Sequence, residues 1–148
     1  MSQSTFPSRL SRGLTGAHLY GRGVSFPFRV SPSGSLVWSE GELNVRESLC
    51  TILRTTRGER MERPDFGCRL AQLLFEPNSV ATLRLIQEEV TSAVSRWEPR
   101  VRLDEVVASV NPADPRAVDV SLAYTLVATG GRERLQLTIS PDPGGTTP

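Results

Sequence analysis

The sequence predicts an α+β fold in which two main helices pack on one face of a small antiparallel sheet. Three features predict it: two helical apolar stripes, alternating apolar residues in the C-terminal third, and short turns between the alternating segments. The chain has 148 residues, of which 38% are hydrophobic and 22% charged, as expected for one globular domain. No apolar run exceeds three residues, so we expect no membrane span and no secretory leader, and synthesis in the cytoplasm.

Composition divides the chain into three regions. Residues 1–23 are rich in Ser, Gly and Arg without apolar periodicity, which predicts a flexible basic arm. Residues 24–139 contain every periodic segment and are predicted to be the folded domain, and residues 140–148 form a polar Pro/Gly tail that we expect to be disordered. Residues 1–39 hold four arginines and no acid, which is too dilute for a nucleic-acid-binding surface.

The folded region begins with a predicted hairpin over residues 24–39. Phe26, Phe28 and Val30 alternate, a Pro-Ser-Gly turn follows, and Leu36–Trp38 is the second apolar segment. This pattern is typical of a short hairpin or of two edge strands.

The first helix is predicted from Asn44 to about Thr55. Asn44 with Glu47 three residues later resembles a capping box, and apolar residues follow at helical spacing: Val45, Leu49, Ile52 and Leu53. Gly58 then marks the end of the helical segment. A loop is predicted over residues 57–78, with a short apolar turn inside it.

The second helix carries the strongest signal in the chain. Asn78 or Ser79 is the predicted cap, and Pro99 ends the helix because proline lacks the N–H that the ladder needs. Its apolar stripe consists of Leu83, Ile86, Val90, Ala93, Val94 and Trp97. Three strands follow, over residues 101–110, 118–128 and 133–139, and their short connections predict an antiparallel meander.

Two clusters of residues are not explained by packing. The first spans residues 53–67, where ten of fifteen residues are charged, Gly or Pro. It is either a solvated connection or a functional loop. The second is Trp97-Glu98-Pro99-Arg100, where an extended segment would let Glu98 and Arg100 project together from the corner after the helix. That pair is either a surface ion pair worth at most about 1 kcal/mol, or a contact with partner chains.

Together, and in this order, the two clusters resemble the small baseplate wedge proteins of contractile injection systems. The first cluster has the pattern Leu53-x-Thr55-x-x-Gly58-Glu59-Arg60-x-x-x-Pro64-x-Phe66-Gly67, and the second ends a helix with Glu98-Pro99-Arg100. The resemblance covers about residues 24–139 and includes, more distantly, type VI secretion baseplate subunits. An intact first motif favours a phage or phage-like particle.

The resemblance implies a structural role, with several copies in a ring of the baseplate. The implied partners are the sheath subunit, larger baseplate wedge proteins and inner tube or hub proteins, without nucleic acid or membrane. The sheet is expected to offer the first sheath ring a template for strand exchange. The implied partner-interface residues are Gly58, Glu59, Arg60, Pro64, Phe66, Gly67, Glu98, Pro99 and Arg100.

The alternative is a peptidoglycan-cleaving, lysozyme-like enzyme, because members of this family have been described so. Glycoside hydrolysis usually needs two carboxylates, one with a raised pKa. The candidates Glu59, Glu62, Asp65 and Glu98 each have an arginine within two residues, which lowers a carboxyl pKa, so we expect no catalytic residues. Two cysteines and one histidine cannot supply a zinc site, so no metal and no cofactor are expected, and both thiols should be reduced.

Overall fold

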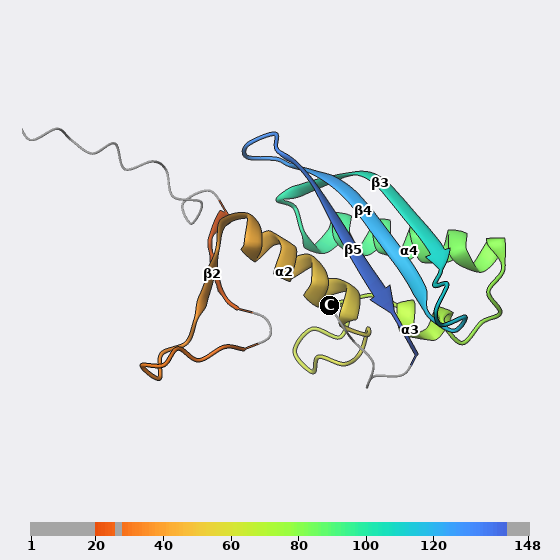
Figure 1. Ribbon diagram of the computed structural model, residues 1–148, viewed down its shortest axis with the longest axis horizontal. Helices are drawn as coiled ribbons and strands as arrows, with labels where there is room; N and C mark the ends of the chain where they lie inside the picture. Colours follow the sequence, from red (N-terminus) through yellow and green to blue (C-terminus); the bar gives the residue numbers. More distant parts are fainter. Residues whose placement is uncertain (1–19, 26–27, 142–148) are drawn as a thin grey trace, which may run out of the picture.

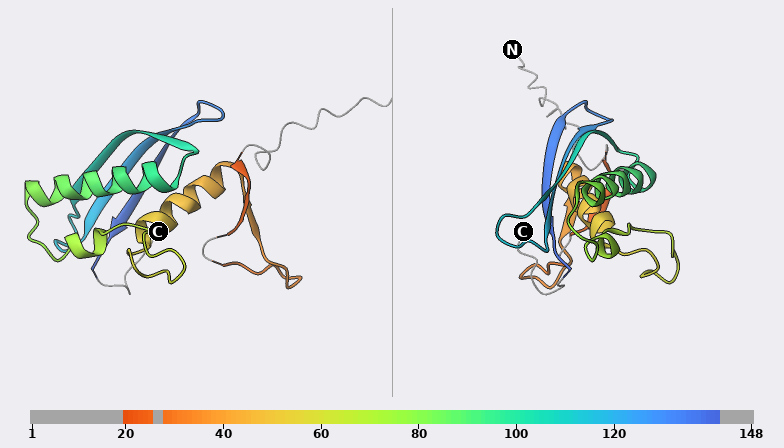
Figure 2. Two further views of the ribbon diagram at one scale, coloured as in Figure 1. Left: turned by 180° about the vertical axis from the view of Figure 1, so that it is seen from behind. Right: turned by 90° about the vertical axis from the view of Figure 1, so that its right-hand side faces the viewer.

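The computed structural model describes residues 20–25 and 28–141, and it confirms the α+β prediction. Three antiparallel strands form a meander in the order β3-β4-β5, and the helices cover one of its faces (Figures 1 and 2). A separate two-stranded hairpin stands beside this body. The elements are β1 (Arg22–Val24), β2 (Trp38–Glu40), α2 (Gly41–Arg54), α3 (Leu70–Leu73), α4 (Val80–Trp97), β3 (Val101–Val110), β4 (Val118–Leu126) and β5 (Arg132–Ile139).

The core lies between the sheet and the two long helices. Strand β4 is central, and its alternate residues are fully buried: Val118, Val120, Leu122, Tyr124 and Leu126. Strand β5 pairs with β4 in an unbroken register, whereas β3 shifts register between Leu103 and Glu105. Strand β4 ends at Leu126, two residues earlier than predicted, because the turn to β5 begins there and the Gly130 N–H bonds to Leu126 O at 2.8 Å.

Helix α4 agrees with its prediction at both ends. The Ser79 hydroxyl accepts a hydrogen bond from the Thr82 backbone N–H at 3.1 Å, and the helix ends at Trp97. Ile86, Val90, Ala93 and Val94 of the predicted stripe are buried against the sheet and α2. None of the helices in the described ranges is long and apolar enough to span a membrane.

The predicted start of the first helix is wrong. Helix α2 begins at Gly41, and Glu40 occupies the cap position without a side-chain cap bond. Asn44 lies inside the helix, where its amide donates to the carbonyl oxygens of Tyr20 and Gly21, both at 3.4 Å. The polar side chain therefore fixes the preceding segment rather than the helix end. The predicted end at about Thr55 is confirmed.

The predicted hairpin is confirmed, but its paired strands lie at the two ends of the predicted range of residues 24–39. Strands β1 and β2 pair antiparallel from Arg22↔Glu40 to Val24↔Trp38, and Val30 bridges to Leu36 nearer the turn. Phe26 lies outside the described residues. Tyr20 is buried, and Arg22 and Gly23 belong to strand β1, although composition assigns residues 20–23 to the arm. The remaining predictions of an arm and a tail fall on residues 1–19 and 142–148, outside the described ranges.

Candidate interaction site

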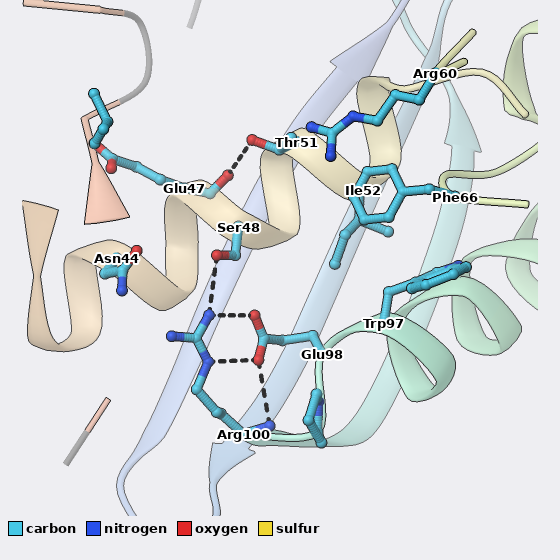
Figure 3. A pocket seen from close by; sticks show the side chains of 12 residues that line it. Asn44, Glu47, Ser48, Thr51, Ile52, Arg60, Phe66, Trp97, Glu98 and Arg100 are labelled. Atoms are coloured by element: carbon cyan, nitrogen blue, oxygen red, sulfur yellow. Dashed lines mark hydrogen bonds and ion pairs between the residues drawn. The ribbon is translucent and has the colours of Figure 1, made fainter. Parts of the chain in front are cut away.

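The two charged clusters lie side by side around one pocket of about 410 Å³ (Figure 3). The Phe66 and Trp97 rings meet with centroids 5.1 Å apart and planes tilted by 60°. The Arg60 guanidinium lies 4.2 Å from the centroid of the Phe66 ring. Ile52 of α2 and Val24 of β1 complete the apolar lining. Phe66 and Trp97, which are 31 positions apart in the sequence, thus line the same surface hollow.

Glu98 and Arg100 form a bidentate ion pair at the corner between α4 and β3. Arg100 Nε donates to Glu98 Oε1 at 2.6 Å, and Nη2 donates to Oε2 at 2.5 Å. The Glu98 residue is only 2% exposed, although the sequence predicted that both side chains project from the corner. The hydrogen bond to Glu98 raises the pKa of Arg100 above its ordinary value, as expected for a charge-assisted pair.

Arg100 also connects segments that are distant in the sequence. Its Nη1 donates to the Tyr20 carbonyl oxygen at 2.5 Å, and Nη2 donates to the Ser48 hydroxyl of α2 at 3.0 Å. Its own carbonyl oxygen accepts the Val127 N–H after β4. One side chain therefore holds Tyr20, α2 and the corner together, and Figure 3 shows its contacts with Ser48 and Glu98.

The connection after α2 is a closed loop rather than a loose one. Thr56 forms a parallel bridge with Cys68, and Gly58 N donates to Pro64 O at 2.8 Å. The Glu59 carboxylate accepts the Thr56 N–H at 3.0 Å, so it closes the first turn of the loop. Gly67 adopts a φ of +97°, where a β-carbon would lie 2.2 Å from Thr55 O.

Ion pairs with α4 fix the loop, while its tip remains exposed. Arg57 pairs with Glu89 at 3.3 Å, and Asp65 pairs with Arg96 at 3.7 Å. Residues 59–65 are all exposed, and Met61 is 100% exposed. The loop thus offers solvent a row of alternating charges on a defined backbone.

The pocket contains hydrogen-bonding groups that the described residues do not satisfy. Trp97 Nε1, a donor, and Glu47 Oε2, an acceptor, are both buried and lack a partner there. Buried polar atoms normally find partners. A donor, an acceptor, the Arg60 guanidinium and apolar walls suit a polypeptide segment, which carries both polar and apolar groups.

The structure gives the surroundings of all four acids that the enzyme hypothesis considered. Both Glu98 oxygens accept from Arg100, Glu59 bonds to the backbone, Asp65 pairs with Arg96, and Glu62 is exposed. Within residues 20–25 and 28–141, no three His, Cys, Asp or Glu side chains cluster as a metal site would require. Both cysteines are free thiols, and burial raises the pKa of Cys68 to about 11.

Sequence reasoning missed the α2 side of the site. Ser48 and Glu47 lie on α2, and Tyr20 lies in the segment assigned to the arm. A serine one position before the buried Leu49 is a weak signal of a polar contact. No pattern in the sequence marks a backbone carbonyl as an arginine acceptor.

The fold and the two motif clusters define a small baseplate protein of contractile tail-like systems. The profile of the family described as "Baseplate wedge protein gp25" matches residues 39–131. The chain belongs to this baseplate wedge family. It is 28% identical over 105 residues to baseplate wedge protein gp25 of Enterobacteria phage T4, covering 66% of this chain and 78% of that protein. It is 36% identical over 83 residues to baseplate protein W of Escherichia phage P2, and the match covers 56% of this chain and 67% of that protein.

Solved structures show the same relationship. A proposed tail lysozyme from Geobacter sulfurreducens superposes with a TM-score of 0.66 at 35% identity, covering 75% of this chain and all of that one. A chain of the post-contraction pyocin R2 baseplate superposes with a TM-score of 0.53 at 28% identity, and the match covers 67% of this chain and 97% of that one. The matched proteins are thus named as baseplate components, with one named after an enzymatic activity.

Proposed function

We propose that this subunit joins the inner baseplate ring to the first sheath ring and templates sheath assembly. The observation that carries the proposal is the free edge of β5. Within the described residues β5 pairs with β4 alone, through eight consecutive residue pairs without a bulge. A regular unpaired edge accepts a strand from another chain, with main-chain hydrogen bonds providing the affinity.

The opposite edge is less suited to strand addition. Strand β3 shifts register between Leu103 and Glu105 and carries exposed charges at Arg102, Asp104 and Glu105. Bulges and charges are the features by which natural sheets prevent pairing at an edge. The asymmetry of the two edges favours β5 as the template for the sheath.

The pocket and the exposed loop tip are the proposed contacts with the larger wedge proteins and with tube or hub proteins. Arg60 and Phe66 reach the pocket, while Glu59 and Pro64 lie on the tip. Gly58, Gly67, Glu98 and Arg100 shape these surfaces from within. Several copies would lie in one ring of the particle, after assembly in the cytoplasm.

Proline at position 136 tests the templating role. Leu126 N donates to Gly131 O at the β4–β5 turn, and the alternation of an antiparallel ladder then directs the Gln136 N–H away from β4. Gln136→Pro removes one donor from the free edge and leaves the β4 pairing intact. We expect particles with baseplates and tubes but at least tenfold fewer extended sheaths in electron micrographs, when the variant replaces the native gene.

The matched control is Gln136→Thr, which keeps the N–H and the β propensity at the same exposed position. It should give native sheath counts. Thermal melting of both purified variants checks that the domain is folded. Full-length sheaths at native frequency on Gln136→Pro particles would refute templating through this edge.

A peptidoglycan-cleaving activity is the second candidate, favoured by the name of the Geobacter relative. The positions of the acids argue against it, because Glu98 is fully engaged by Arg100 and Glu59 by the backbone. We expect purified protein to release no soluble fragments from peptidoglycan above background, with Glu59→Gln and Glu98→Gln indistinguishable from the native chain. Turnover that either substitution abolishes would establish the enzyme instead.

A further inference from the structure

The hairpin formed by β1 and β2 presents an apolar surface to solvent. Phe28 is 75% exposed and Val30 is 64% exposed, and the cross-strand pair of Val24 and Trp38 is also partly exposed. We call this set the hairpin surface; it consists of Val24, Phe28, Val30, Leu36, Trp38 and the adjoining Leu43 of α2. Single exposed apolar residues are ordinary, but a group of them gathered on one hairpin and the adjoining helix start marks an interaction site.

The hairpin has little support from the rest of the molecule. Its strands pack mainly against α2, and the turn end extends away from the body (Figures 1 and 2). A two-stranded ribbon is marginally stable without a third strand or a packed face. Residues 20–38 also precede residue 39, where the family match begins, whereas Leu43 lies within the matched residues.

Charge on the hairpin limits what can cover it. Residues 20–39 contain Arg22 and Arg29 and no acid. Arg22 is neutralised by Glu40 at 2.5 Å and lies 5.3 Å from the Trp38 ring centroid. Arg29 lies between Phe28 and Val30, is exposed, and makes no ion pair within the described residues. Arginine beside aromatic side chains is typical of the centre of a protein–protein interface.

The same charge argues against occupants from within this chain. Residues 1–19 hold two arginines and no acid, so they would bring like charge onto Arg29. A symmetric contact with the hairpin of a second copy would place two Arg29 side chains in one interface. Residues 142–148 contain one acid but no large apolar side chain.

We propose that the hairpin surface binds a segment of another protein of the particle that is apolar and flanked by carboxylates. Apolar side chains of the segment cover Phe28, Val30 and Leu36, and its carboxylate pairs with Arg29. This contact is independent of sheath templating, because the hairpin and β5 belong to different sheets.

A photo-crosslinking side chain identifies the occupant. Benzophenone-alanine is placed at position 28 of the full chain, assembled particles are irradiated, and the linked peptide is identified by mass spectrometry. We expect a peptide of a different protein that contains apolar residues and a net negative charge. A link to this chain, own or second copy, or no link in assembled particles, would overturn the proposal.

Paired substitutions test the two chemical components. Phe28→Ser and Arg29→Glu should each reduce incorporation of the subunit into purified particles at least tenfold, measured by quantitative mass spectrometry. The controls are Phe75→Ser, at 78% exposure near α3, and Arg84→Glu, exposed on α4, which should incorporate normally.

The outcomes also separate this proposal from sheath templating. Loss of the hairpin contact removes the subunit from the baseplate, whereas Gln136→Pro leaves the subunit in place without sheath. Normal incorporation of Phe28→Ser would refute docking at the hairpin, and normal incorporation of Arg29→Glu would refute an acidic partner.

Discussion

Replacing Arg100 with alanine is expected to lower the unfolding free energy of the isolated protein by about 3 kcal/mol. The Glu98 side chain is 3% exposed and the Arg100 side chain 29%, so truncation leaves a buried carboxylate without its counter-ion. Breaking a buried pair costs about 3–5 kcal/mol, and the partial exposure of Arg100 places this site near the lower end. Urea unfolding of the purified variant measures the change.

A second substitution that removes the charge of Glu98 identifies the cause of the stability loss in Arg100→Ala. If the stranded Glu98 charge dominates, Glu98→Gln combined with Arg100→Ala should be more stable than Arg100→Ala alone. Arg96→Ala is the matched control, because its ion pair with Asp65 is largely exposed and should contribute less than about 1 kcal/mol. If Arg100→Ala lowers the free energy of unfolding as little as Arg96→Ala does, the Glu98–Arg100 pair does not contribute as a buried ion pair.

Lysine at position 100 separates charge from geometry. A single ammonium group can restore the charge beside Glu98, but it cannot reproduce the planar fork that also reaches Tyr20 O and Ser48 Oγ. We expect Arg100→Lys to recover part of the lost stability and no more. Assembly defects in Arg100 variants must therefore be compared at matched stability, since the fold itself depends on this residue.

Local periodicity was sufficient to predict the elements that form the core. In α4 the apolar stripe, the Ser79 cap and Pro99 all indicate the same helix, and the structure has that helix from Val80 to Trp97. The alternation in β4 likewise places every second residue in the core. Where several local signals agree with one another and with the packing, the element forms as the sequence predicts.

Tertiary contacts decide the parts that were not predicted. Asn44 satisfies a local capping pattern, but its amide instead bonds to carbonyl oxygens that are more than 20 residues away in the sequence. Glu98 and Arg100 are correctly paired from their spacing, yet their burial depends on α2 and Tyr20, which the pattern does not contain. Sequence spacing identifies neighbours along the chain and gives no information on what covers them.

Substituting Gly67 with alanine is expected to cost about 3 kcal/mol, the sum of two separate terms. A φ of +97° is in the region that L side chains rarely adopt, which costs about 1–2 kcal/mol. The added β-carbon would also lie 2.2 Å from the backbone oxygen of Thr55, an overpacking that costs about 1–3 kcal/mol. Thr55 O cannot move freely, because it accepts the Cys68 N–H at 3.0 Å.

Gly58 provides a matched control within the same loop. Its φ of +89° is equally unusual, but nothing lies within 4 Å of the position of a β-carbon. Gly58→Ala should therefore cost only the conformational term, about 1–2 kcal/mol. The difference between the two variants in urea unfolding isolates the clash with Thr55 O, and equal losses would show that no such clash exists.

The same substitution should also expose the loop to proteolysis. The 55–68 loop carries three arginines, and its closure between Thr55 and Cys68 limits the extended conformations that an arginine-specific protease requires. Opening that closure in Gly67→Ala should accelerate cleavage within the loop at least tenfold, with Gly58→Ala closer to the native rate. Because the loop holds Phe66 against Trp97, its opening would also remove one wall of the pocket. Native cleavage rates in Gly67→Ala would mean that Gly67 does not control the loop geometry on which the proposed partner contacts depend.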